Sequence, residues 1–163
     1  MISKQMQDKL NDQINLELYS SYIYASMAAY FDSINLDGFS SWMKAQAGEE
    51  LKHAMKVFGY VCERAGRVEL KAIAAPKIDW ASPLAAFEDA YKHECHVSSS
   101  YHKLVDVCQS EKDFATLNFI QWFIAEQVEE EDSVLKIVEQ LKIVKDAPGG
   151  LFMIDRGLAQ RQG

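Results

Sequence analysis

The sequence predicts an all-α protein that folds as a four-helix bundle with one long crossover and a short fifth helix at its C-terminal end. Helix breakers are rare, with 8 Gly and 3 Pro in 163 residues, so the chain divides into a few long segments. Four of these segments are about 28 residues long, or ~40 Å at 1.5 Å per residue. Each carries apolar residues at alternating three- and four-residue steps, which is typical of bundle helices.

Capping residues and breakers mark the expected helices in order along the chain. Ser3 is the expected cap of the first helix and Asp37 that of the second, which ends at Gly66. Ser82 precedes the third helix, with a proline in its first turn. Pro148 ends the fourth helix. We expect helices over 4–33, 38–65, 83–110, 113–146 and 151–160, within one domain of residues 1–163.

The lengths of the connections predict the topology. The turns between the first and second helices, and between the third and fourth, are short, so each pair is antiparallel. About 16 residues separate the second helix from the third, and at ~3.3 Å per residue they can run the full length of the bundle. We therefore expect one long crossover between the two pairs.

Charge and hydropathy exclude two classes of partner. Lys and Arg number 17 against 24 Asp and Glu, a formal net charge of -7, which is the wrong sign for binding phosphate backbones. No segment approaches the ~18 uninterrupted apolar residues of a membrane span, and the N-terminal residues do not resemble a secretion signal. We expect a cytoplasmic protein that binds neither nucleic acid nor membrane.

Acidic or polar residues interrupt all four apolar stripes near the middle of each helix. Burying one uncompensated carboxylate costs several kcal/mol, and four that repel one another require cations or bound protons. Two divalent ions would neutralise four glutamates. The stripes therefore predict a dinuclear metal site, with a metal-free polar network or a misphased stripe as the alternatives. The interrupting residues are Glu17, Glu50, Glu94, Gln127 and Glu130.

A shift of 77 residues aligns the first helix pair with the second. The first half offers Glu-x-x-His and the second Gln-x-x-Glu, and this i, i+3 spacing places both groups on one helix face. Imidazole with mostly oxygen ligands suits Fe(II), Mn(II) or Zn(II), and the spacing does not choose among them. The shift pairs Glu17 with Glu94, Tyr24 with Tyr101, Glu49 with Glu126, Glu50 with Gln127, and His53 with Glu130.

Four motifs resemble those of the prokaryotic non-haem ferritins, and the resemblance covers the whole chain. They are NLELYS at 15–20, GEELKH at 48–53, YKHE at 91–94 and AEQVEEE at 125–131. The resemblance implies a ferritin-like bundle that oxidises Fe(II) with dioxygen or peroxide at a dinuclear ferroxidase centre. It also implies storage of ferric mineral inside a homo-oligomeric cage of 24 subunits.

The same resemblance assigns the iron ligands. Glu17, Glu50 and His53 would bind the first iron. Glu50 would also bridge to a second iron, held by Glu94 and Glu130.

Supporting positions follow from the resemblance as well. Gln127 would lie beside the second iron or touch bound oxygen, and Tyr24 matches the family's ferroxidase-centre tyrosine, with a core aromatic as the alternative. Trp122 is similar to a tryptophan near the centre, but we expect it to pack in the core. A solvated acidic run is the alternative to a third iron position. The ligands of that third position would be Glu49, Glu126, Glu129 and Glu130.

The sequence differs from two related families, the bacterioferritins and the rubrerythrins, at positions that bind metal or haem. Bacterioferritins and rubrerythrins carry Glu-x-x-His on the fourth helix, where this chain has Gln127 and Glu130. The bacterioferritin haem ligand is a methionine at the position of Leu51, so we expect no haem. A di-iron oxidase or peroxidase without mineral storage is the alternative function, and a structural subunit that binds no metal is a third.

Overall fold

The computed structural model describes residues 1–145 and 147–161, and every regular element within them is an α-helix. The helices are α1 (Lys4–Ser33), α2 (Asp37–Glu63), α3 (Pro83–Glu111), α4 (Phe114–Val144) and α5 (Pro148–Leu158). This is the four-helix bundle with a short fifth helix that the sequence predicts. Among the described helices, none combines the length and hydropathy needed to cross a bilayer.

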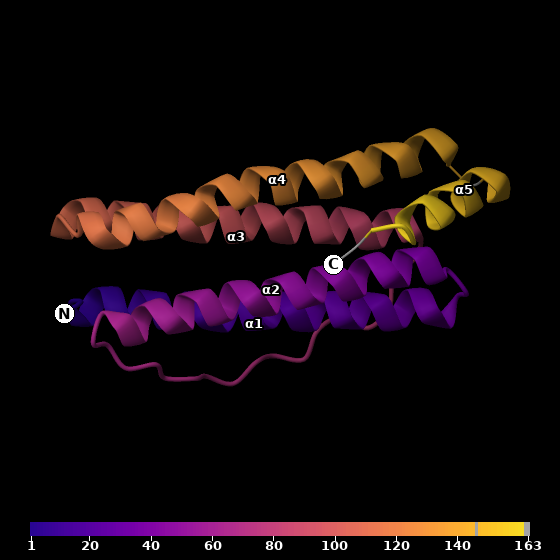
Figure 1. Cartoon of the computed structure of the whole chain (residues 1–163). Coiled ribbons are helices and arrows are strands. Elements are labelled where there is room, and N and C mark those ends of the chain that lie inside the picture. The colour runs from indigo at the N-terminus through magenta and orange to yellow at the C-terminus, as the bar shows by residue number, and fades with distance from the viewer. Residues whose placement is uncertain (146, 162–163) are drawn as a thin grey trace.

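The long helices form two antiparallel pairs, α1 with α2 and α3 with α4 (Figure 1). Residues 64–82 run along the outside of the first pair to the other end of the bundle, as Figure 1 shows. α3 therefore runs parallel to α2, which confirms the predicted crossover. α5 folds back at the end of α4 and contacts both α2 and α4.

Two apolar clusters fill the interior, one toward each end of the bundle. One contains the rings of Phe31, Phe39 and Phe87, whose neighbouring centroids lie 5.0 to 5.9 Å apart. The other includes Leu10 and Phe123. Burying each such side chain stabilises the fold by about 2–3 kcal/mol, so the clusters fix the layer that lies between them.

Most helix ends agree with the expected bounds, and two differ for local reasons. Ser3 and Ser82 cap α1 and α3 through their side chains, as predicted. The N-cap of α2 is Leu36, so the prediction that Asp37 is the cap is wrong. Asp37 is instead the first helical residue, where the positive end of the helix dipole stabilises its negative charge. α5 begins at Pro148, because proline fits the first helical position.

Gly66 lies just after α2, as expected, but it does not adopt the positive φ that is typical of glycine at a helix C-terminus. Ala65 has the positive φ of 55°, and the Gly66 N–H donates to the Val61 carbonyl at 2.9 Å. Glycine at 66 provides space, because a Cβ there would lie 2.8 Å from Ile2 Cδ1. The expected end of the fourth helix, at 146, lies outside the described residues.

Candidate metal centre

Acidic side chains from all four long helices enter the layer between the two apolar clusters. Glu17 comes from α1, Glu50 and His53 from α2, Glu94 from α3 and Glu130 from α4. None of the five is more than 8% exposed. Burial of these groups follows from the stripe pattern, because each occupies an inward position of its helix.

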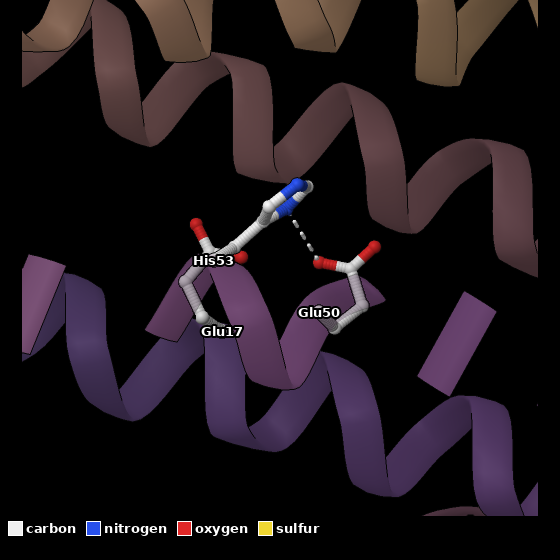
Figure 2. A group of neighbouring side chains, drawn as sticks. All are labelled: Glu17, Glu50 and His53. Atoms are coloured by element: carbon white, nitrogen blue, oxygen red, sulfur yellow. Dashed lines mark ion pairs between the residues drawn. The ribbon is translucent and has the colours of Figure 1, made fainter. Parts of the chain in front are cut away.

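Three of these residues form one compact group. Glu17, Glu50 and His53 each offer a ligand atom, and these atoms lie within 4.8 Å of one another. Figure 2 shows their side chains facing a common space, with Glu17 on α1 and the other two on α2. His53 Nδ1 lies 3.4 Å from Glu50 Oε2. Two carboxylates and one imidazole at this spacing can hold a single divalent cation.

Glu17 presents one oxygen atom that the described part of the protein leaves without a partner. Its Oε1 accepts hydrogen bonds from Gln13 Nε2, at 2.8 Å, and from the Tyr101 hydroxyl. Its Oε2 is buried and accepts no hydrogen bond within the described residues. Such an atom costs about 1–3 kcal/mol or more unless a proton or cation occupies it. Glu17 Oε2 therefore fits the chemistry of a metal ligand.

Glu94 is held by donors from two other helices. The Tyr24 hydroxyl on α1 donates to Glu94 Oε1, and Gln127 Nε2 on α4 lies 3.2 Å from Glu94 Oε2. Tyr24 is fully buried, so the structure makes it a core aromatic whose hydroxyl reaches the acidic layer. Gln127 lies beside the carboxylate expected to bind the second iron.

Gln46 joins the carboxylates of α2 and α4. Its side-chain amide is completely buried and donates to Glu50 Oε1 at 2.8 Å and to Glu130 Oε2 at 2.7 Å. Both amide protons are therefore used by residues expected to bind the second iron. This link holds the two carboxylates together across the gap between the helix pairs.

A cavity of about 430 Å³ adjoins the cluster, and the four residues expected at a third iron position all line it. Glu129 is exposed, whereas Glu49 and Glu126 are half-buried. Ligand atoms of His53, Glu126 and Glu130 lie within 4.8 Å of one another. The structure therefore places His53 beside residues of the third position as well as beside the first group, which the sequence did not indicate.

Arg161, which follows α5, also reaches this cavity. Its Nη2 donates to Glu49 Oε2 at 2.5 Å and to Gln46 Oε1 at 2.9 Å. The guanidinium carbon lies 4.4 Å from the centre of the Trp42 ring, a cation–π contact. A positive charge from the chain itself thus occupies one edge of the acidic cavity.

Burial shifts the protonation of the clustered carboxyl groups. Burial, followed by repulsion from Glu50, raises the pKa of Glu17 to about 8. Burial also raises the pKa of Glu94 to about 7 and that of Glu130 to about 7, and it raises the pKa of Glu50 well above its usual value. Near neutral pH the cluster consequently retains protons, which divalent cations would displace.

Sequence reasoning missed four side chains that hold the cluster in place: Gln13, Gln46, Tyr101 and Arg161. Gln13 and Gln46 each stand four residues before a glutamate, so a Gln-x-x-x-Glu spacing would have indicated them. Tyr101 is the partner of Tyr24 under the 77-residue shift. We find no sequence signal that marks Arg161.

The expectation that Trp122 packs in the core is wrong. Its side chain is 38% exposed and lines the cavity. Its ring meets the His53 ring edge-on at 5.5 Å, while Lys56 Nζ lies 3.3 Å from its centroid. Trp122 therefore lines the cavity beside the acidic cluster instead of packing in the core.

Comparisons with known proteins agree with this architecture. A family model described as a ferritin-like domain matches residues 7–144. The bacterial non-heme ferritin of Bacteroides fragilis is 42% identical over 161 residues, covering 99% of this chain and 100% of the relative. The protein of the same name from Staphylococcus aureus is 35% identical, covering 99% of this chain and 97% of the relative.

Solved structures give the same result. An open pore ferritin from the archaeon Archaeoglobus fulgidus is 54% identical, with a TM-score of 0.99, covering 99% of this chain and 100% of that one. A closed form engineered from the Archaeoglobus fulgidus ferritin is also 54% identical, with a TM-score of 0.98 and 99% of both chains covered. The chain therefore belongs to the ferritin family.

Proposed function

We propose that the protein oxidises Fe(II) to Fe(III) at a dinuclear ferroxidase centre and stores the product as a ferric mineral inside a cage of identical subunits. The observation that carries the proposal is the buried layer of carboxylates and one imidazole from all four helices. The named relatives support iron as the metal, since they are ferritins. No haem enters the proposed reaction.

The proposed first iron is bound by Glu17, Glu50 and His53. The second is bound by Glu50, Glu94 and Glu130, with Glu50 shared between the two. Four carboxylates supply the negative charge that two divalent ions require, and they stabilise each ion further as its charge rises from +2 to +3. Because one position has an imidazole and the other only oxygen ligands, the two ions are held unequally.

Supporting residues keep the ligands in place during this change of charge. Tyr24 and Gln127 donate hydrogen bonds to Glu94, which fixes that carboxylate at the second position. Gln46 keeps Glu50 and Glu130 together. Glu49, Glu126 and Glu129 line the adjoining cavity, where with Glu130 they form the proposed third position on the path of iron away from the centre.

The proposed reaction balances with either oxidant. Two Fe(II) give one electron each, so that one dioxygen and two protons become hydrogen peroxide. With peroxide as oxidant, the same two electrons and two protons yield two water molecules. Carboxyl groups that hold protons near neutral pH give them up when iron binds, which supplies protons close to the reduced oxygen.

Storage requires an assembly, because a single bundle has no interior large enough for a mineral. α5 exposes Phe152, at 58%, and Met153, at 75%. Neighbouring exposed apolar side chains of this kind favour contact with another subunit. We propose a cage of 24 subunits, in keeping with the ferritins to which the chain is similar.

Iron loading tests the proposed function. After aerobic addition of Fe(II), elemental analysis of the isolated protein should find far more iron per chain than its side chains can bind. Iron that stops near two per chain while oxidation continues would support the alternative, a di-iron oxidase or peroxidase without mineral storage. The absence of stoichiometric iron would identify a structural subunit and contradict the proposal.

A further inference from the structure

We propose that Tyr101 is a positioning residue of the metal centre, whose hydroxyl fixes Glu17 so that Oε2 faces the first metal ion. The inference rests on the proposed function, because it assigns a role in binding the first of the two ions. Tyr101 makes no contact with the metal in this account and acts only through Glu17.

The ring of Tyr101 is held rigidly on α3. The side chain is 1% exposed and stacks on Phe123, with ring centroids 4.9 Å apart and planes inclined by 17°. The hydroxyl at the end of this packed ring donates to Glu17 Oε1, on a helix of the other pair. A rigid donor of this kind sets the position of its acceptor rather than following it.

A second hydrogen-bond donor, on α1 itself, also holds Glu17 Oε1. Gln13 Nε2 donates to this oxygen at 2.8 Å. Gln13 Oε1 lies 2.8 Å from Ser100 Oγ, whose single hydroxyl proton also has the Val97 carbonyl oxygen at 2.6 Å as an acceptor. One oxygen of the Glu17 carboxylate is therefore held by Tyr101 of α3 and by Gln13 of its own helix.

The two hydrogen bonds to Oε1 leave Oε2 for the metal. A carboxylate oxygen has two lone pairs, so Oε1 is saturated by its two donors. Oε2 is buried and accepts no hydrogen bond from the described residues. Glu17 is thereby prepared to bind one cation through a single, defined oxygen, without rearrangement when the ion arrives.

The same kind of contact occurs a second time between α1 and α3, with the donor and acceptor helices exchanged. Tyr24 of α1 donates to Glu94 Oε1 of α3, whereas Tyr101 of α3 donates to Glu17 Oε1 of α1. Each tyrosine stands seven residues after the glutamate of its own helix and serves the glutamate of the opposite helix. Each metal position thus depends on a hydroxyl from the other half of the bundle, and removing one hydroxyl should weaken one position selectively.

The test removes each hydroxyl and reads the first position directly. In the assembled, iron-free protein, Zn(II) titration followed by the NMR signals of the His53 imidazole reports binding at the position that contains the histidine. We expect Y101F to raise the half-saturating Zn(II) concentration by about ten- to a hundredfold, the range for the loss of a hydrogen bond that orients a metal ligand. Y24F should leave this midpoint unchanged and weaken the second equivalent of Zn(II), measured by calorimetry.

Tyr60→Phe is the matched control. It also removes a buried hydroxyl, one that contacts Thr116 near the end of the bundle instead of the centre. A His53 midpoint in Y101F equal to that in Y60F would overturn the inference, and so would equal effects of Y101F and Y24F on both positions. If Y101F loses helical structure, Gln13→Met, which removes the other donor to the same oxygen, must raise the His53 midpoint or the inference fails.

The titration of the unaltered protein separates this inference from the function on which it depends. If its His53 signals do not respond to Zn(II), the dinuclear centre itself is wrong, and the role of Tyr101 falls with it. If they respond and the hydroxyl has no effect, only the role of Tyr101 is overturned.

Discussion

Glu17 is fully buried, and burial together with repulsion from Glu50 raises its pKa to about 8. In an unfolded chain a glutamate has a pKa of about 4.3. The folded, metal-free protein therefore binds more protons than the unfolded chain at every pH between these values. Linkage requires its free energy of unfolding to fall as the pH rises through this range. A bound cation removes the penalty by replacing the protons.

We expect the melting temperature of the chelator-treated protein to be higher at about pH 6 than at about pH 8.5, because buried carboxyl groups become charged in between. Glu17→Gln should reduce this dependence and stabilise the metal-free protein by about 1–3 kcal/mol at the higher pH. Thermal unfolding followed by circular dichroism provides the measurement.

Surface carboxylates with lowered pKa values do not interfere with this comparison. Ion pairs and hydrogen bonds lower the pKa of Asp32, Asp89 and Asp113, so these groups are charged throughout the range. Their contribution to stability is lost only in stronger acid. A melting temperature that is constant or increases with pH would show that the interior carboxylates are not the dominant titrating groups.

α5 contacts α2 at a point where only glycine fits. Asp155 Oδ1 accepts the Phe39 N–H at 3.0 Å and so satisfies a donor in the first turn of α2. A Cβ on Gly38 would lie 1.7 Å from the carbonyl oxygen of Asp155. The close approach of these two backbones sets the direction in which the tail runs toward the metal centre.

Gly38→Ala should displace α5 while leaving the four long helices intact. We expect amide hydrogen exchange to accelerate about tenfold or more over residues 148–158, since α5 loses its contact with α2. Gly48→Ala is the matched control, because a Cβ there meets open space in the described structure. It should stabilise α2 by about 0.5–1 kcal/mol. Equal exchange in the two variants would contradict this account of how α5 is held.

Arg161, which follows α5, is expected to compete with cations for Glu49, to which it donates a hydrogen bond. Replacing it with glutamine removes a positive charge that lies 2.5 Å from a carboxylate oxygen. Zn(II) should then bind the cavity about two- to fivefold more tightly, the range expected for a partly exposed ion pair. Arg156→Gln, which neutralises an exposed arginine of the same tail, is the control. Weaker or unchanged Zn(II) binding in R161Q would contradict the competition.

Periodicity predicted the helices and the buried acidic layer because it reports which face of a helix is turned inward. Gln46 and Tyr101 lie on the inward stripes, so their burial follows from the sequence. Their partners in the other helix pair do not, since Tyr101 and Glu17, like Gln46 and Glu130, are 84 residues apart and meet only after the two pairs dock. Arg161 lies beyond the end of α5, and no helical period extends to it.

At the scale of the whole molecule, the bundle consists of two similar helix pairs that enclose the two unequal positions proposed for metal. The 77-residue shift relates Glu17 to Glu94 but places Glu130 where the first pair has His53. The crossover of residues 64–82 joins the two pairs, which lie side by side (Figure 1). An approximately symmetric fold therefore yields one position with an imidazole and one with oxygen ligands only.

Anomalous diffraction at the iron absorption edge, from crystals soaked anaerobically in Fe(II), tests the central claim most directly. Two iron peaks per chain are expected in the interior, one bound by Glu17, Glu50 and His53, and one by Glu50 together with Glu94 and Glu130. An interior without iron, or iron bound only by exposed carboxylates such as Glu129, would contradict it.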